Sequence, residues 1–359
     1  MSLQLLFLFG LTTVSAFSCK DQNNDDVDWW FAYKMPKMKK SNGIQGLAEG
    51  VAFYYLDANN PVFSPSQVDL AGEDQAIGYT LKQFYDSKED PSVFHVLYND
   101  DPPDERDELN VLRNSTEEER RVNQYGHTKG VSFFDNRSGV WYIHSVPRFP
   151  SPGGYHYPDS AKLYGQSMLC ISLKYDQLAD VGSQLFFNRP IIYSSQLPPS
   201  MALDNPNLAK IIVGKYKKGA PTSSVIDLQS KGGRTFRSFA KSGEFGDDIY
   251  SNLIAPNLKT NLTVETWRRG SPISKDCSSR YLVADALEMK VGDLSEFKYT
   301  RDHSKVAVSD STRLPYTCVG DINRMTSQFF RGGGTVCLLD KNVWNAYIQL
   351  IKSVESCGA

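Results

Sequence analysis

The stretch Gly126–Asp135 reads Gly-His-Thr-Lys-Gly-Val-Ser-Phe-Phe-Asp and contains the pattern His-x-Lys. A second His-x-Lys follows far downstream in Arg301–Ser309, Arg-Asp-His-Ser-Lys-Val-Ala-Val-Ser. In an extended strand, residues two apart point to the same face, so each pattern predicts an imidazole beside an ammonium group. Either pattern alone is better explained by a surface strand that ends in solvent. The second copy favours a shared function.

The two pairs, His127 with Lys129 and His303 with Lys305, supply the groups that phosphate-ester cleavage needs. An imidazole can attack phosphorus as a nucleophile or donate a proton to a leaving oxygen. A lysine beside it binds the non-bridging phosphate oxygens as a point charge. Two such pairs facing each other would make a metal-free phosphodiester-cleaving site.

Both patterns, with several other segments, resemble the deoxyribonuclease II family. Gly-His-Thr-Lys-Gly-Val (126–131) and Asp-His-Ser-Lys (302–305) look like the family's two signatures. The likeness continues, in the family's order, through Val-Asp-Trp at 27–29, Tyr-Lys-Met-Pro at 33–36, His-Ser-Val-Pro-Arg-Phe-Pro at 144–150, Thr-Cys-Val-Gly-Asp-Ile-Asn-Arg at 317–324 and Arg-Gly-Gly-Gly-Thr at 331–335. These segments span nearly the whole chain.

The resemblance implies an α/β fold of the phospholipase D-like type. In that fold a pseudo-dimer of two α/β lobes with mixed sheets surrounds a central groove. The lobes would be residues 17–200, with the first motif, and 201–359, with the second. The implied activity is an acid endodeoxyribonuclease that cleaves double-stranded DNA without sequence preference, metal or cofactor. It would act through a phosphohistidine and leave 3′-phosphate and 5′-hydroxyl ends, in lysosomal or apoptotic DNA degradation.

The resemblance implies His127, Lys129, His303 and Lys305 as catalytic residues and Asn323 as a phosphate-binding residue. The first half has no matching Asn, and Ser145 is the candidate substitute. Asp135 either orients a histidine or begins a turn, and the turn is favoured. Asp302 could polarise the next residue, although successive strand residues point apart. Of the other histidines, His144 is expected to pack within its hairpin, His95 to lie in the core and His156 in a loop.

One residue departs from the family pattern, because Val306 stands where Trp is common. The loss of aromatic bulk could loosen packing or base stacking. This keeps open a rival of another class, a secreted binding or toxin-like glycoprotein with little turnover. A second rival is a lipid phosphodiesterase of the same fold, whose groove would be apolar. The intact His-x-Lys pairs favour the nuclease.

The first residues predict entry into the secretory pathway. Residues 1–16 form an apolar run that ends in Val-Ser-Ala, which fits a signal-peptidase site, although no Lys or Arg precedes the run. A buried N-terminal helix is the alternative. No later segment is apolar for long enough to span a bilayer. We expect a lysosomal or secreted protein without a membrane anchor, as a monomer or homodimer.

The six cysteines match no zinc spacing and suit that oxidising route. Fifteen pairings are arithmetically open for six cysteines. The resemblance implies Cys19–Cys170, Cys277–Cys357 and Cys318–Cys337. Three sequons, at Asn114, Asn136 and Asn261, predict glycosylation on exposed loops.

A formal net charge of −2 is unfavourable for a protein that binds DNA, since duplex affinity comes mostly from Lys and Arg. Acidic residues cluster between 100 and 119 and need not face the substrate. At acidic pH histidines gain charge and some carboxylates lose it. Low pH would therefore favour both binding and the protonated histidine that the chemistry needs.

The remaining chain alternates strand and helix patterns, which favours α/β layers. Strands are expected at 28–35, 51–57, 93–98, 130–134, 140–145, 191–195, 225–229, 235–241, 262–268, 279–289 and 297–308. Helices are expected at 69–86, 160–187, 247–254 and 342–354, and a charged excursion with a short helix at 99–121.

Overall fold

The computed structural model describes residues 16–39, 43–103, 124–292 and 295–357. The expected signal peptide, apart from Ala16, and most of the charged excursion, with Asn114, lie outside these ranges. Among the described residues, no helix has the length and apolar character needed to cross a membrane.

Two large sheets form the molecule. The first has the strand order β10-β6-β7-β8-β9-β3-β4-β5, and every neighbouring pair is antiparallel. Its strands are β3 (Trp29–Lys34), β4 (Phe53–Asp57), β5 (Ser64–Pro65), β6 (Phe94–Asn99), β7 (Lys129–Phe134), β8 (Ser138–His144), β9 (Gln166–Lys174) and β10 (Ile192–Gln196). A separate small ribbon pairs β1 (Cys19–Lys20) with β2 (Asp26–Val27).

The second sheet has the order β11-β12-β18-β17-β16-β13-β14-β15, with β19 also paired to β14. It is mixed, because β13 and β14 run parallel. Its strands are β11 (Ser223–Gln229), β12 (Thr235–Lys241), β13 (Leu262–Glu265), β14 (Val283–Val291), β15 (Ser295–Lys298), β16 (Val306–Ser309), β17 (Tyr316–Gly320), β18 (Gly333–Leu339) and β19 (Ile351–Val354). The chain is thus an α/β protein with few helices.

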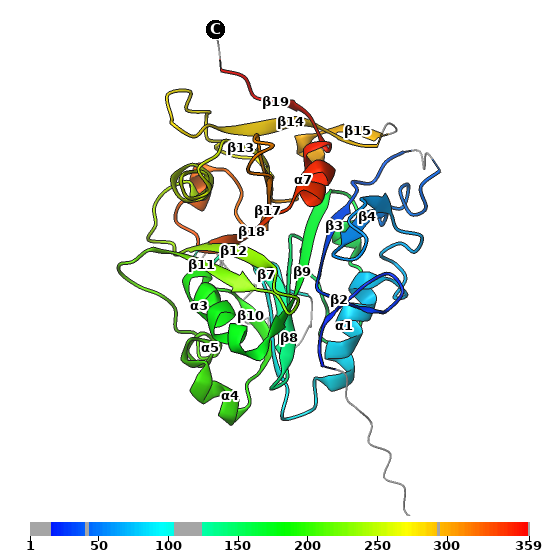
Figure 1. Cartoon of the computed structure of the whole chain (residues 1–359), viewed down its shortest axis with the longest axis vertical. Coiled ribbons are helices and arrows are strands. Elements are labelled where there is room, and N and C mark those ends of the chain that lie inside the picture. Colours follow the sequence, from blue (N-terminus) through cyan, green and yellow to red (C-terminus); the bar gives the residue numbers. More distant parts are fainter. Residues whose placement is uncertain (1–15, 40–42, 104–123, 293–294, 358–359) are drawn as a thin grey trace, which may run out of the picture.

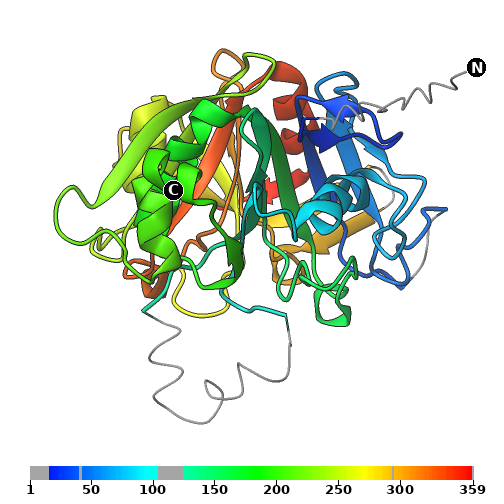
Figure 2. The ribbon, with the colours of Figure 1, turned by 90° about the horizontal axis from the view of Figure 1, so that it is seen from below.

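The main apolar core lies between the two sheets. Inward-facing side chains of β8 and β9, such as Ile143 and Leu169, share one cluster with Val319 of β17 and Val336 of β18. Figure 2 shows the orange-red strands of the C-terminal half beside the green strands β8 and β9. Helix α1 (Ala76–Ser87) covers the outer face of the first sheet, and the turns Tyr250–Ile254 and Ala255–Leu258 (α6) cover that of the second.

Two helices pack across the boundary between the sheets. Helix α3 (Leu178–Asn188) follows β9 of the first sheet but packs on β11, β12 and β18 of the second, with α4 (Pro199–Asp204) and α5 (Pro206–Ile212) beyond it (Figure 1). Helix α7 (Lys341–Ile348) follows β18 and reaches back to β3, where Tyr347 packs its ring against Phe31. The two halves of the chain therefore stabilise each other.

The halves follow the same path. In the first, β6, β7, β8 and β9 lie side by side, and α3 leads to β10, which pairs with β6. In the second, β13, β16, β17 and β18 lie side by side, and α7 leads to β19. Strand β19 pairs with β14, which is the neighbour of β13. Each His-x-Lys comes at the start of the second strand of its path, since Lys129 opens β7 and Lys305 directly precedes β16.

Several expected elements are wrong. The predicted helix at 160–187 is strand β9 followed by α3, because Gln166–Lys174 fills the slot between β3 and β8 and is buried on both faces there. The predicted helix at 342–354 ends at Ile348 and gives way to β19. The predicted strand at 297–308 is broken by the 3₁₀ turn Tyr299–Arg301. The other expected strands are present, with shifted ends.

Three disulfides join Cys19 to Cys170, Cys277 to Cys357 and Cys318 to Cys337, the pairs that the resemblance implies. Cys318–Cys337 links directly opposite residues of β17 and β18. Cys19–Cys170 fastens the N-terminal ribbon to the central strand β9. Asn136 is exposed in the β7–β8 turn, whereas Asn261 is half-buried and accepts a hydrogen bond from the Leu282 N–H at 2.9 Å.

Candidate active site

The first motif is attached to the opposite half of the chain. The backbone N–H of His127 donates to the Gly332 carbonyl at 2.9 Å, just before β18. Thr128 Oγ1 donates to Asp321 Oδ2 at 2.9 Å, and the Lys129 N–H donates to Asp321 Oδ1 at 3.3 Å. Gly332 and Asp321 both belong to the second half. The C-terminal half therefore fixes the backbone that presents His127.

Asp100 gathers the charged groups around His127. Its carboxylate forms ion pairs with Lys129 and with Arg331 Nη2 at 3.0 Å, and it lies 3.6 Å from His127 Nε2. Burial raises the pKa of Asp100, but Lys129, His127 and Arg331 together hold it well below its usual range. Arg331 also donates to the carbonyls of Tyr125 and Gly126 at 3.1 and 2.9 Å. Asp100 is therefore a permanent anion beside the first histidine.

The second motif mirrors this attachment with different side chains. The N–H of His303 donates to the Gly165 carbonyl at 2.9 Å, just before β9 of the first half. Its imidazole stacks on Tyr164, with ring centroids 4.1 Å apart and an interplanar angle of 7°. Trp267 meets the same imidazole edge-on at 3.6 Å. The second histidine is thus enclosed by aromatic rings.

Lys305 is buried behind His303. Its N–H donates to Ser167 Oγ at 3.1 Å, and its ammonium group donates to the His303 carbonyl at 2.6 Å. Burial and the charge of Lys129 lower the pKa of Lys305 to about 7, against nearby carboxylates that raise it. Lys305 is therefore cationic at acidic pH and loses its charge as the pH rises through about 7.

The two motifs meet in one electrostatic environment. Burial, together with the charges of Lys305 and Lys129, lowers the pKa of His303 to about 2. Burial also holds the pKa of His127 well below 6.5, where Asp100 raises it and Lys129, Arg331 and Lys305 lower it. Each histidine thus feels the lysine of the other motif. An anionic phosphate arriving between them would favour the charged imidazole and ammonium forms.

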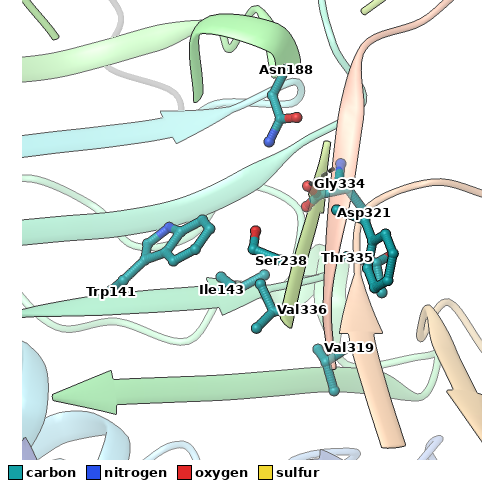
Figure 3. Close-up of a pocket in the computed structure, with 10 residues that line it drawn as sticks. Trp141, Ile143, Asn188, Ser238, Val319, Asp321, Gly334, Thr335 and Val336 are labelled. Carbon is teal, nitrogen blue, oxygen red and sulfur yellow. Dashed lines mark hydrogen bonds between the residues drawn. The ribbon is translucent and has the colours of Figure 1, made fainter. Parts of the chain in front are cut away.

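Asp321 binds the first motif through hydrogen bonds. It accepts from Thr128, from Lys129 and, at 3.2 Å, from the Gly334 N–H, while burial raises its pKa to about 7. Figure 3 shows Asp321 and Gly334 at one side of a small cavity between the sheets, with Asn188 above it. Its other walls are largely apolar, and no His or Lys of the motifs lines it. The cavity therefore lies beside the residues that hold the first motif, and the histidines and lysines of the motifs are not part of its wall.

The remaining predicted residues have varied surroundings. Asn323 lies buried in the loop after β17, and its Oδ1 has no hydrogen-bond partner among the described residues. Ser145 bonds Gln166 and the Ser167 N–H, a packing role at the end of β8. Asp135 accepts from the N–H groups of Arg137 and Ser138 and so begins the hairpin turn. Asp302 accepts from the Tyr33 hydroxyl and from the Ser304 N–H at 2.8 Å.

The other three histidines lie in structural surroundings. His144 is fully buried, accepts from the Val146 N–H at 3.2 Å and packs against aromatic rings. His95 is buried in β6, and His156 is exposed in a loop. Val306 is buried in the core between the sheets, beside a small cavity that Glu265 and Tyr33 also line.

Sequence reasoning missed four residues of the site: Asp100, Arg331, Tyr164 and Trp267. Asp100 and Trp267 lie just beyond the ends of β6 and β13, the strands that pair with β7 and β16. Arg331 and Tyr164 each directly precede the glycine whose carbonyl holds a histidine. These positions correspond only once the strand paths of the two halves are known and aligned, so no local sequence pattern could have found them.

Within the described ranges, no three His, Cys, Asp or Glu side chains lie close enough together to ligate a metal ion. The groups that the arrangement does gather are two imidazoles, two ammonium groups and a guanidinium. These can bind an anion and can attack it or transfer protons to it.

Comparison with known proteins gives a consistent result. A family profile described as deoxyribonuclease II matches residues 18–357. Deoxyribonuclease-2 from Caenorhabditis elegans is 50% identical, over 99% of this chain and 98% of the relative. Plancitoxin-1 from Acanthaster planci is 38% identical over 99% and 97%, and deoxyribonuclease-2-alpha from Mus musculus 36% over 99% and 98%. On this similarity, the chain belongs to the deoxyribonuclease II family.

Proposed function

We propose that the protein is an acid endodeoxyribonuclease that hydrolyses DNA phosphodiesters through its two His-x-Lys motifs, without a metal ion. One observation carries the proposal. Each histidine is held by a glycine carbonyl of the opposite half, His127 by Gly332 and His303 by Gly165, and the lysine charge of each motif acts on the histidine of the other. A DNA phosphate between them would contact both ammonium groups.

The reaction would proceed in two steps. One imidazole attacks phosphorus, the bond to the 5′-oxygen breaks, and the other imidazole donates its proton to that oxygen. The same second imidazole then takes a proton from water, which attacks the phosphohistidine and releases a 3′-phosphate. Lys129 and Lys305 stabilise the charge on the five-coordinate phosphorus, which is commonly the largest catalytic contribution.

Acidic pH suits this site for two reasons. Lys305, whose pKa burial lowers to about 7, is cationic only below that value. The depressed pKa of His303 leaves one imidazole neutral and nucleophilic at pH 5. The proton donor must hold its proton at the same pH, and the phosphate anion of bound DNA supplies the charge that favours it.

The corresponding strand paths and the crosswise attachment of the motifs support a phospholipase D-like pseudo-dimer whose groove lies where the halves meet. We extend the proposal to double-stranded DNA in a lysosomal or secreted setting, with glycans on Asn136 and Asn261. The protein would act as a monomer or homodimer. Asn323 would complete the phosphate site by donating its amide N–H to a phosphate oxygen, because it lies in the loop that follows Gly320, whose N–H binds the Lys305 carbonyl at 3.0 Å.

The test is plasmid cleavage at about pH 5 in excess EDTA, comparing wild type with His127→Ala and His303→Ala. We expect cleavage by the wild type, 3′-phosphate ends, and loss of at least about 100-fold in each variant. The control is His156→Ala, an exposed histidine, which should cleave normally. A wild type that binds DNA but cleaves none at any pH would instead support the binding or toxin-like glycoprotein.

A further inference from the structure

Two lysines are completely buried at the ends of corresponding strands. Lys34 ends β3 and Lys241 ends β12, and neither side chain is exposed. Strand β3 pairs with β9, and β12 pairs with β18. Both lysines therefore lie beside the loop that enters the next strand. Lys34 belongs to the Tyr-Lys-Met-Pro segment, to which the proposed reaction assigns no role.

Each ammonium group donates to three backbone carbonyls of that loop. For Lys34 the acceptors are Ala161 at 3.0 Å, Lys162 at 2.5 Å and Tyr164 at 2.7 Å. For Lys241 they are Gln328 at 2.9 Å, Phe329 at 2.9 Å and Arg331 at 2.6 Å. The acceptors occupy the same relative positions in the two loops. Three carbonyl acceptors match the three protons that a charged ammonium group can donate.

The next residue in each loop holds a histidine. Gly165 follows the last acceptor of Lys34, and its carbonyl accepts from the His303 N–H at 2.9 Å. Gly332 follows the last acceptor of Lys241, and its carbonyl accepts from the His127 N–H at 2.9 Å. Each lysine is thus connected to one histidine through two hydrogen bonds, one from the lysine to the loop and one from the histidine to the same loop. The lysine and the histidine are remote from each other in sequence.

Stability alone does not explain these lysines. Burial lowers the pKa of Lys34, which Asp302 raises and Arg301 and Lys162 lower. Burial lowers the pKa of Lys241 to about 7, with Asp248 and Asp247 raising it and Arg331 lowering it. Burying an ammonium group is costly, and an apolar residue of similar volume often gives equal stability. What the charge adds is a fixed loop conformation, since one group holds three carbonyls at once.

We propose that Lys34 and Lys241 are positioning residues, each fixing the loop that holds one of the two histidines. Lys34 acts on His303 through Gly165, and Lys241 acts on His127 through Gly332. The inference rests on the proposed function only in taking these histidines as the reacting groups. Misplacing a reacting group by about 1 Å can cost about 100-fold in rate.

The decisive experiment observes the imidazoles directly. The chain has five histidines, so a protein labelled with ¹⁵N-histidine gives few signals, which single His→Gln variants assign. We expect Lys34→Met to shift or broaden the His303 signals and leave those of His127 in place. Lys241→Met should do the reverse. Lys20→Met, which removes a surface partner of Asp26, is the control and should move neither.

This readout separates the inference from the function. A selective shift supports the positioning role even if the protein cleaves no DNA. Equal shifts at both histidines, or none, in folded variants would overturn it while leaving the proposed nuclease intact. Where a Met variant fails to fold, Lys34→Gln and Lys241→Gln, which keep two donor protons, take its place under the same criteria.

Kinetics provide the second readout. In both variants kcat should fall by about 10- to 100-fold with KM within about twofold, because the substrate contacts stay while the reacting groups move. A rise in KM at constant kcat would mean that the lysines serve DNA binding, which would overturn the inference.

Discussion

The two half-sites, one around His127 and one around His303, have the same backbone arrangement and differ in their side chains. Beyond the ends of β6 and β13, one has Asp100 and the other Trp267, and directly before the histidine-holding glycines one has Arg331 and the other Tyr164. His127 therefore lies in a charged network and His303 between aromatic rings. One scaffold can thus give two identical groups different proton affinities, which a reaction that needs a nucleophile and an acid requires.

The largest expected effect tests whether the half-sites work as a unit. His127→Ala and His303→Ala should each reduce kcat by at least about 100-fold, and the double variant should lose little more than the worse single one. Single-turnover cleavage of a short duplex measures this. Additive losses would mean that the half-sites act independently.

The charged half-site can be tested through Asp100→Asn. Burial lowers the pKa of His127 and the Asp100 carboxylate raises it, so removing the carboxylate lowers that pKa further. We expect a rate loss of about 10-fold or more, with one limb of the pH profile of kcat/KM displaced to lower pH.

The displaced limb identifies the role of His127, because the acidic limb reports the nucleophile and the alkaline limb the acid. Asp135→Asn, in the hairpin turn, is the control for a lost carboxylate. If neither limb moves, Asp100 does not set the proton affinity of His127.

In the half-site around His303, removing an aromatic neighbour should raise the pKa of the histidine, whereas Asp100→Asn lowers that of His127. Burial is the main cause that lowers the pKa of His303 to about 2, so Trp267→Ala, which opens that environment, raises it. The limb governed by His303 should then move to higher pH, while Trp267→Phe should largely restore it. A pH–rate series on all three proteins decides the point, and a shift to lower pH would contradict the burial argument.

The charge of Lys305 should limit the pH range in which the wild-type protein is active. Since its pKa is lowered to about 7, it is charged below that pH and becomes neutral as the pH rises through it. The rate at which bound substrate is cleaved should therefore decline across this pH range, even when the substrate concentration is kept saturating. A kcat that stays constant to pH 9 would show that the charge of Lys305 is not needed.

The smallest effect concerns the core beneath the second half-site. Val306 is buried between the sheets, so Val306→Ala should lower the free energy of unfolding by about 1–2 kcal/mol through lost burial and a small cavity. Denaturant unfolding measures the change, and kcat at 25 °C should stay within about twofold. A large selective loss of activity would place Val306 in the catalytic machinery.

Much of the scaffold was predictable from local pattern. Alternating and β-branched runs predicted β3, β4, β6, β7 and β12, and the two His-x-Lys copies predicted the four residues that we propose as the reacting groups. Strand β9 was missed because an apolar run buried on both faces does not distinguish strand from helix, and only pairing with β3 and β8 decides it.

The surroundings of the histidines were not predictable in the same way. Asp100 and Trp267 reach them across strand pairs, and Lys34 and Lys241 act through loops of another strand. No local pattern marks a lysine as fully buried, because composition favours the surface for that residue. Such partners appear only when the register of the sheets is known.

In the proposed reaction, one of two unequal histidines attacks phosphorus while the other supplies the proton. The most direct measurement is mass spectrometry of protein quenched in alkali during turnover of an oligonucleotide at about pH 5, with the adduct located by peptide sequencing. We expect a phosphoryl-linked fragment on His127 or His303, on one of them only, and we expect it to be absent when that residue is replaced. An adduct on any other residue, or cleavage with no adduct at any time point, would contradict it.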